Sequence, residues 1–253
     1  METEQGNANL DKKQGSNENS DKTMSLYQHL GELRQRILTS FICWALSSIG
    51  GWHLANPILD YTRSMDSLKE VQLILIRPPE AFFVRMKIAM VTGLIISLPI
   101  ILYEILAFIS PGLTKNEKKW ALTLVPGSAI LFYGGASFAL FLLLPIALNF
   151  FLVDMTQGIA NPQISLEEYV NFLTALALAG GLVFQTPIIL FFLTMIGILS
   201  SEKLKKARPA AIVICFVVAA VVTPPDPFSQ VITALPMVFL YEMTIWLTVI
   251  LKK

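Results

Sequence analysis

Long apolar stretches are the feature that most limits what this chain can fold into. A helix needs about 20 residues to cross the ~30 Å hydrocarbon core of a bilayer, where only helices and closed barrels satisfy every backbone hydrogen bond. The sequence is 54% hydrophobic and 15% charged over 253 residues, which is too apolar for a water-soluble domain. Six apolar segments are present: roughly 37–54, 88–109, 122–152, 171–199, 210–222 and 231–251. We therefore predict an all-α, polytopic membrane protein with six transmembrane helices.

The part of the chain before the first apolar segment has a different composition. Residues 1–23 are rich in Asn, Ser, Gly, Lys and Glu and show no apolar periodicity, which is typical of a disordered tail. From Met24 to Ile37, leucines recur at helical spacing between polar residues, which predicts an amphipathic helix that leads into the membrane. We expect a disordered tail at 1–23 and a six-helix transmembrane domain at 24–251.

The distribution of lysine and arginine predicts the orientation. The loops near 153–170 and 223–230 contain neither residue, and the long loop after the first apolar segment contains basic and acidic residues interleaved. The other polar segments are basic, with Arg34, Arg36, Lys115, Lys118, Lys119, Lys203, Lys205, Lys206, Arg208, Lys252 and Lys253. Because basic loops tend to stay on the cytoplasmic side, both termini are expected to be cytoplasmic.

Turn-forming prolines mark the outer loops. A proline followed by an acidic residue and then apolar residues is typical of a helix start. We therefore expect short helices at 79–87 and 163–172, which would cap the outer face. The fifth apolar segment, of about 13 residues, would cover about 20 Å as a helix. We expect short fifth and sixth helices that leave a concave face.

Residues that could perform catalysis or bind a metal are sparse. Cys43 and Cys215 lie inside apolar segments, and His29 and His53 are far apart, without a carboxylate or cysteine cluster at ligand spacing. The sequence contains no P-loop, GxSxG or HExxH motif. We expect a protein that is not an enzyme, with no metal, no cofactor and no nucleic-acid partner. A small-molecule or ion secondary transporter is the alternative, although the internal repeat typical of that class is not evident.

Three short motifs lie at the ends of the apolar segments. They read HLGELRQR at 29–36, FISPGLTKNEKK at 108–119 and TPPDPFSQ at 223–230, and LPMVFLYE follows at 235–242. In this order, and on six apolar segments, they resemble the TatC family, the multi-spanning receptor component of the twin-arginine (Sec-independent) protein translocase. The resemblance covers residues 24–251.

The resemblance implies a receptor that binds the twin-arginine signal peptides of folded cargo proteins. Such a receptor recruits single-span TatA/TatB-type subunits, associates with other copies of itself, and uses the proton-motive force instead of ATP. It is an integral protein, surrounded by membrane lipid, of the bacterial plasma membrane or the thylakoid membrane.

The resemblance assigns signal-peptide recognition to two carboxylates. Glu32 in the first motif and Glu117 in the second match the family's two cytoplasmic carboxylates. A carboxylate accepts two parallel hydrogen bonds from a planar guanidinium, a geometry that lysine cannot offer. The alternative is that Glu32 pairs with Arg36 along its own helix and that Glu117 pairs with neighbouring lysines.

Three further residues are expected to contribute to the same signal-peptide site. Phe108 and Pro111 are expected to shape the loop after the second apolar segment, with core packing as the alternative account. Glu104 lies in the last turns before the Pro-Gly turn and is a secondary candidate for the site.

Gln185 is expected to bind a partner subunit. It lies inside the fourth apolar segment, where an amide can donate and accept hydrogen bonds without the cost of a buried charge. Many bacterial members of the family carry glutamate at this position. A glutamine here resembles the cyanobacterial and plastid branch of the family.

Overall fold

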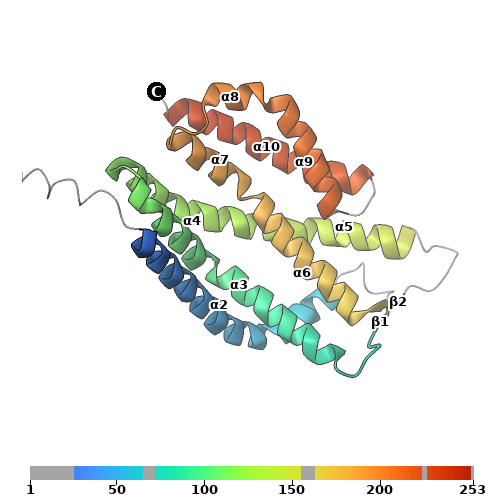
Figure 1. Cartoon of the computed structure of the whole chain (residues 1–253). Helices are drawn as coiled ribbons and strands as arrows, with labels where there is room; N and C mark the ends of the chain where they lie inside the picture. The colour runs from blue at the N-terminus through green and yellow to red at the C-terminus, as the bar shows by residue number, and fades with distance from the viewer. Residues whose placement is uncertain (1–25, 65–71, 155–162, 224–226, 252–253) are drawn as a thin grey trace, which may run out of the picture.

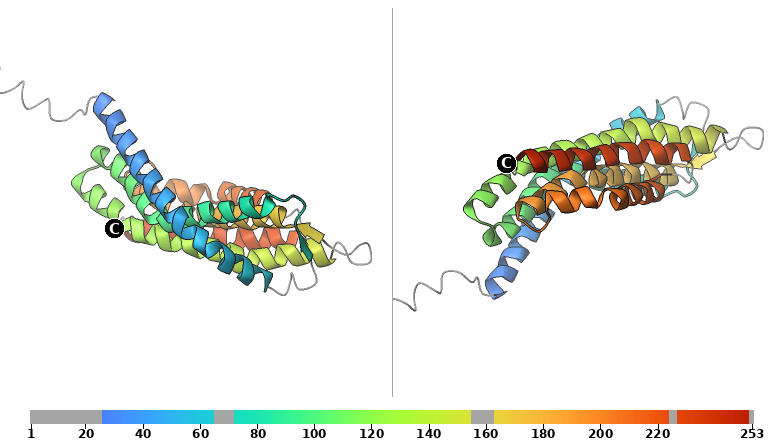
Figure 2. Two further views of the ribbon diagram at one scale, coloured as in Figure 1. Left: turned by 90° about the horizontal axis from the view of Figure 1, so that it is seen from below. Right: turned by 90° about the horizontal axis from the view of Figure 1, so that it is seen from above.

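The computed structural model describes residues 26–64, 72–154, 163–223 and 227–251, which are almost entirely helical (Figure 1). Most of the helices run between the two ends of an elongated molecule, as the views in Figure 2 also show. The disordered tail predicted at 1–23 lies outside the described residues.

Each of the six apolar segments is helical. In chain order the helices are α2 (Leu26–Arg63), α3 (Glu80–Ile109), α4 (Lys115–Phe138), α5 (Leu144–Asn149), α6 (Leu166–Val183), α7 (Thr186–Met195), α8 (Ser201–Lys206), α9 (Arg208–Val222) and α10 (Pro227–Leu251). Two π-helical turns, at Ala139–Leu143 and Phe150–Asp154, extend α4 and α5 into one helical segment. Within the described ranges, five segments are long and apolar enough to cross a membrane, and α9 is a shorter apolar helix.

The prediction of short fifth and sixth helices is correct for the fifth only. α9 has 15 residues, which span about 22 Å. α10 has 25 residues, which span about 37 Å and are enough to cross a bilayer. The apolar segment at 231–251 already has 21 residues, so its length did not require a short helix, and α10 extends it by one turn that begins with Pro227, a residue suited to the first position of a helix.

The short helix predicted at 79–87 is instead the first part of α3. This helix runs from Glu80 to Ile109 without a break. Residues 81–92 contain no glycine or proline, so nothing in the local sequence ends the helix before the membrane segment begins. The prediction of a separate surface helix at this position was therefore wrong.

The helix predicted at 163–172 divides into a strand and the start of α6. Strand β2 (Gln163–Ser165) pairs in parallel with β1 (Gln72–Ile74), so the fold is not purely α-helical. The Ser165 hydroxyl then accepts a hydrogen bond from the Glu167 amide at 3.2 Å, which caps the start of α6. These two segments therefore do not form the predicted cap of short helices.

Glu80 joins the loop before α3 to the start of α6. Its carboxylate, only 2% exposed, accepts hydrogen bonds from the amides of Ile76 (2.8 Å), Arg77 (3.2 Å) and Glu167 (2.8 Å) and from the hydroxyl of Ser165 (2.7 Å). Burying a carboxylate is costly unless donors replace the lost water, and four donors do so here. Together with the β1–β2 ladder, this contact fixes the two loops to each other.

Small residues let neighbouring helices pack at close range. A Cβ atom on Gly51 would lie 2.5 Å from the carbonyl oxygen of Ala89, so α2 and α3 approach closely there. A Cβ atom on Gly135 would clash with the carbonyl oxygen of Gly180, so α4 and α6 do the same. Close backbone approach through small residues is a common way for helices to associate in lipid, where no hydrophobic effect drives them together.

The core and the edge of the bundle differ in burial. The core lies where α3, α5, α6 and the last turns of α2 meet, and it contains the fully buried side chains of Leu144 and Tyr169. α2 packs extensively on α3, and toward its end Ala55 and Leu59 also join this core. Its large apolar side chains, including Phe41, Leu46 and Ile49, are exposed. In a membrane this exposed surface of α2 faces lipid tails.

The close α4–α6 contact predicts a difference between two adjacent glycines. A methyl group at Gly135 would meet Gly180 and the ring of Phe184, whereas a methyl group at Gly134 would have no atom within 4 Å. Overpacking costs about 1–3 kcal/mol, so Gly135→Ala should lower the midpoint of thermal unfolding in detergent. Gly134→Ala should leave it unchanged or raise it slightly, because alanine favours helix. Equal midpoints would show that these helices are not in such close contact.

Candidate functional site

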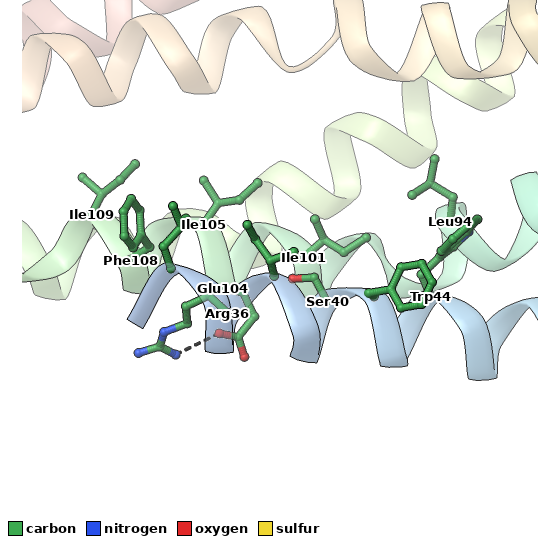
Figure 3. Close-up of a pocket in the computed structure, with 12 residues that line it drawn as sticks. Arg36, Ser40, Trp44, Leu94, Ile101, Glu104, Ile105, Phe108 and Ile109 are labelled. Carbon is green, nitrogen blue, oxygen red and sulfur yellow. Dashed lines mark hydrogen bonds and ion pairs between the residues drawn. The ribbon is translucent and has the colours of Figure 1, made fainter. Parts of the chain in front are cut away.

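An open groove of about 520 Å³ lies between α2 and α3 (Figure 3). It is lined by Leu33, Arg36, Ile37, Ser40, Phe41, Trp44, Leu94, Ile101, Glu104, Ile105, Phe108 and Ile109. Figure 3 shows Arg36, Glu104 and Phe108 toward one end of the groove and Trp44 and Leu94 toward the other. The groove therefore suits a ligand with a charged part at one end and an apolar part along the rest.

Arg36 is held between two carboxylates at the polar end of the groove. Its guanidinium donates to Glu104 Oε2 at 2.8 Å and to Glu32 Oε1 at 3.2 Å. Glu32 and Arg36 are four residues apart on α2 and so share a face of that helix, whereas Glu104 comes from α3. With both carboxylates ionised, two negative charges and one positive charge give the cluster a net charge of −1.

The cluster has one acceptor that is not used. Glu32 Oε2 is buried, and no residue in the described part of the chain donates a hydrogen bond to it. A buried carboxylate oxygen without a donor is costly, so a donor that arrives from outside would be favoured there. A second guanidinium could bind this oxygen without first displacing a donor from it.

Phe108 closes the polar end of the groove. Its ring stacks on His29 with a centroid separation of 4.5 Å and an interplanar angle of 20°. The Pro-Gly turn that follows is a 3-10 turn, Ser110–Gly112, as its sequence indicates. Pro111 is exposed in this turn and does not line the groove, so its part in a binding site stays a prediction.

Three of the predicted signal-peptide residues, Glu32, Glu104 and Phe108, lie together. Glu117 lies in the first turn of α4 at the same end of the molecule (Figure 1), but its side chain is outside the described part, so its role stays a prediction. The alternative pairing of Glu32 with Arg36 is confirmed. The bridge from Arg36 to α3 was not predicted, because spacing along α2 contains no information about which helix lies beside it.

Gln185 lies at the break between α6 and α7. Its Nε2 donates to the backbone carbonyl of Ser128 at 2.8 Å, and the Ser128 hydroxyl donates to its Oε1 at 2.6 Å. Both side chains are buried, at 6% and 2% exposure. The amide of Gln185 thus joins this break to α4 within the chain. Its predicted contact with a partner subunit stays a prediction.

Fold and groove together define the class of protein. It is a polytopic helical membrane protein with an open, mainly apolar groove that ends in a carboxylate-rich cluster. In the described ranges, no group of three or more His, Cys, Asp or Glu residues is placed to hold a metal ion. The apolar walls and the carboxylates at one end have the chemistry suited to a cation attached to an apolar segment.

Comparison with known proteins identifies the family within this class. The family model described as Sec-independent protein translocase protein (TatC) matches residues 28–236. The Sec-independent protein translocase protein TatC of Aquifex aeolicus is 38% identical over 227 residues, which cover 88% of this chain and 94% of that protein. The chain belongs to the TatC family.

Two further comparisons agree with this assignment. The chloroplastic Sec-independent protein translocase protein TATC of Pisum sativum is 39% identical over 228 residues, which cover 90% of this chain and 64% of that protein. A crystal structure of the twin arginine translocase receptor TatC matches with a TM-score of 0.74 at 37% identity and covers 89% of this chain and 100% of that chain. The family resemblance seen in the sequence is thus confirmed.

Family membership also bears on the alternatives. It does not support the small-molecule or ion transporter, since the relatives are protein translocase components. With relatives in bacteria and chloroplasts and helices long enough to span a bilayer, the chain is an integral membrane protein of a bacterial or chloroplast membrane. The bacterial and chloroplast relatives are about equally similar, so the assignment to the cyanobacterial and plastid branch stays a prediction.

The contact between Gln185 and Ser128 predicts the effect of removing either side chain. Gln185→Leu should lower the midpoint of thermal unfolding without preventing folding, because interhelical polar contacts in lipid contribute about 0.6 kcal/mol on average and seldom more than ~2. Ser128→Ala should have a smaller effect, since the Ser128 carbonyl still accepts from Gln185. If Gln185 also binds a partner subunit, crosslinking to that subunit should fall in Gln185→Leu and not in Ser128→Ala.

Proposed function

We propose that this chain is the signal-peptide receptor of a twin-arginine protein translocase and that the groove between α2 and α3 receives the signal peptide. Membership of the TatC family supports the activity. The observation that supports the location is the pairing of a carboxylate cluster with apolar groove walls. Signal peptides have a basic segment followed by an apolar one, which matches this arrangement.

The groove has a length suited to the apolar part of such a peptide. Leu94 and Ile109 line it from α3 and are about 15 residues apart, which corresponds to about 22 Å along the helix. A helical peptide of about 15 residues would fit this length. Its basic end would then lie beside Glu32 and Glu104.

In this proposal Arg36 occupies the carboxylates before the peptide arrives. A peptide guanidinium first donates to the free Oε2 of Glu32 and then competes with Arg36 for Glu104. The net charge of −1 attracts the cationic peptide, and planar guanidinium groups match carboxylates better than ammonium groups do. Glu117, at the same end of the molecule, would bind the second arginine of the pair.

The fold supports six membrane crossings with both termini in the cytoplasm. Five long segments and the shorter α9 make six, and the first residues of α2 lie at the same end as the last residues of α10 (Figure 1). An even number of crossings places both termini on the same side of the membrane. The basic residues of α8 and of the start of α4 lie at that same end, as expected for its cytoplasmic side.

The proposed receptor works with other translocase subunits. Single-span TatA/TatB-type proteins, further copies of this chain and the twin-arginine signal peptides of folded cargo are its proposed partners, together with lipid. In this proposal the proton-motive force drives transport, as the resemblance implies. The receptor itself has no enzymatic activity and no cofactor. The exposed apolar face of α2 is a candidate docking position for the partner helices, whereas the predicted partner contact of Gln185 requires its buried bonds to Ser128 to open.

The proposed orientation predicts which positions a thiol reagent reaches. Single cysteines introduced at Thr114 and Ser201 should be shielded from an impermeant reagent added to intact cells, and one at Gln163 should react. Permeabilised cells provide the control, since all three should then react. Labelling at Ser201 in intact cells would contradict the orientation.

The proposed site predicts the effect of removing its carboxylates. Glu32→Gln/Glu104→Gln should weaken binding of an Arg-Arg signal peptide by tenfold or more, because charge-assisted hydrogen bonds contribute about 1.5–3 kcal/mol each. A Lys-Lys peptide, weakly bound from the start, should lose much less. Peptide binding to detergent-solubilised protein is measured at constant salt. Glu202→Gln, an exposed carboxylate on α8, is the matched control.

Two further variants separate the parts of this site. Arg36→Gln should strengthen Arg-Arg binding severalfold, since it removes the competitor and leaves both carboxylates free. Weaker binding would instead show that Arg36 holds the carboxylates in position for the peptide. Glu117→Gln measures the contribution of the second predicted carboxylate. An unchanged preference for Arg-Arg over Lys-Lys in Glu32→Gln/Glu104→Gln and in Glu117→Gln would place recognition elsewhere.

A further inference from the structure

A second pocket, of about 420 Å³, lies at the corner formed by α8, α9 and the last turns of α10. It is lined by Lys205, Arg208, Ile245, Trp246, Val249 and Ile250. Figure 1 shows α8 beside the C-terminal end of α10, and neither helix contributes to the groove between α2 and α3. The pocket is therefore separate from the proposed signal-peptide site.

The walls of this pocket are firmly held. The Tyr241 hydroxyl donates to the carbonyl of Leu204 at 2.7 Å, which ties α10 to α8. Leu204 and Ile245 are buried at 4% and 1% exposure and pack in one cluster with Tyr241. The helices that carry the pocket are thus held together by buried contacts beneath it.

The polar wall of the pocket has an unused donor. Arg208 Nη2 donates to Glu242 Oε2 at 2.8 Å, but Arg208 Nε is buried and donates to no acceptor in the described part of the chain. The Arg208 side chain lines the pocket and is 43% exposed, so its guanidinium can donate to an acceptor atom that enters the pocket. With the exposed Lys205, the three charged groups sum to +1, which favours an anion.

The other wall of the pocket is apolar and exposed. Trp246 is 67% exposed and Ile250 is 63% exposed, near the end of a membrane-spanning helix. Tryptophan is enriched where lipid headgroups meet the hydrocarbon, and the chains of lysine and arginine extend their charges to the same level. A free inorganic anion would leave this apolar wall uncovered, whereas a molecule with an acyl chain would cover it.

We propose that this pocket binds an anionic phospholipid. The phosphodiester oxygens accept from the Arg208 guanidinium and from the Lys205 ammonium group, and an acyl chain lies against Trp246, Val249 and Ile250. The net charge of +1 selects a lipid with a net negative headgroup over a zwitterionic one. Bound lipid in this position would stabilise the α8–α10 corner without contact with the signal peptide.

The experiment measures lipid retention by the full chain. Protein purified in a mild detergent is mixed with phosphatidylglycerol or phosphatidylcholine, and bound lipid is counted by native mass spectrometry. Lys205→Gln removes one cation of the pocket. Arg208→Gln/Glu242→Gln removes the other cation together with its ion-pair partner, so that Glu242 is not left without a partner. Lys203→Gln, an exposed lysine of α8 that does not line the pocket, is the matched control. Thermal unfolding without lipid verifies that each variant is folded.

Phosphatidylglycerol should be retained more strongly than phosphatidylcholine. Lys205→Gln should weaken its binding about fivefold, the scale of attraction of one basic residue to an anionic membrane surface. Arg208→Gln/Glu242→Gln keeps the net charge at +1 but removes the guanidinium donor, so it should weaken binding less than Lys205→Gln does, and Lys203→Gln should leave binding unchanged. Equal retention of the two lipids, or an equal loss in Lys203→Gln, would overturn the proposal. Displacement of the lipid by millimolar inorganic phosphate would also overturn it, because the site would then be one for free phosphate.

Discussion

A bilayer interior offers no hydrogen bonds to a polypeptide backbone, and most of this structure follows from that constraint. Inside each membrane-spanning segment, the helix supplies its own bonds. Where α6 gives way to α7, neighbouring groups supply them. The amide of Phe184 donates to the carbonyl of Gly180 at 3.2 Å, that of Gln185 donates to Leu182 at 3.0 Å, and the Gln185 side chain bonds to Ser128. The one buried carboxylate that holds two loops together, Glu80, is likewise surrounded by donors.

The groove depends on how unevenly the helices pack. Close approach at Gly51 fixes α2 against α3, and close approach at Gly135 fixes α4 against α6. Because α2 has only α3 as an extensive neighbour among the described helices, one side of the α2–α3 pair stays open. An apolar surface of this kind is stable in lipid but would be costly in water. The membrane therefore permits an open apolar groove whose only charged groups, Arg36 and Glu104, are at one end.

The apolar segments predicted the helices well because hydropathy reflects whether lipid or water surrounds each residue. They predicted the ends of the helices and the contacts between helices poorly. The separate helices at 79–87 and 163–172 were wrong because the first continues into α3 and the second begins with a three-residue strand, too short for a recognisable alternation. The motifs led to Glu32 and Phe108, and the position before the Pro-Gly turn led to Glu104. These three residues do lie together, but the bridge from Arg36 to α3 depends on which helices are neighbours. A single sequence does not contain that information.

Two charge clusters of opposite sign lie at the same end of the molecule and suit different ligands. The carboxylate cluster at Arg36 has a net charge of −1, and the pocket at Arg208 has a net charge of +1 when Lys205 and Glu242 are included. At physiological ionic strength, exposed charges are screened beyond about 8 Å, so each cluster selects its ligand only at close range. A basic peptide is therefore favoured in the groove and disfavoured at the pocket, while an anionic headgroup has the reverse preference. The proposed lipid and the proposed signal peptide would thus bind at the same end of the fold without competition between them.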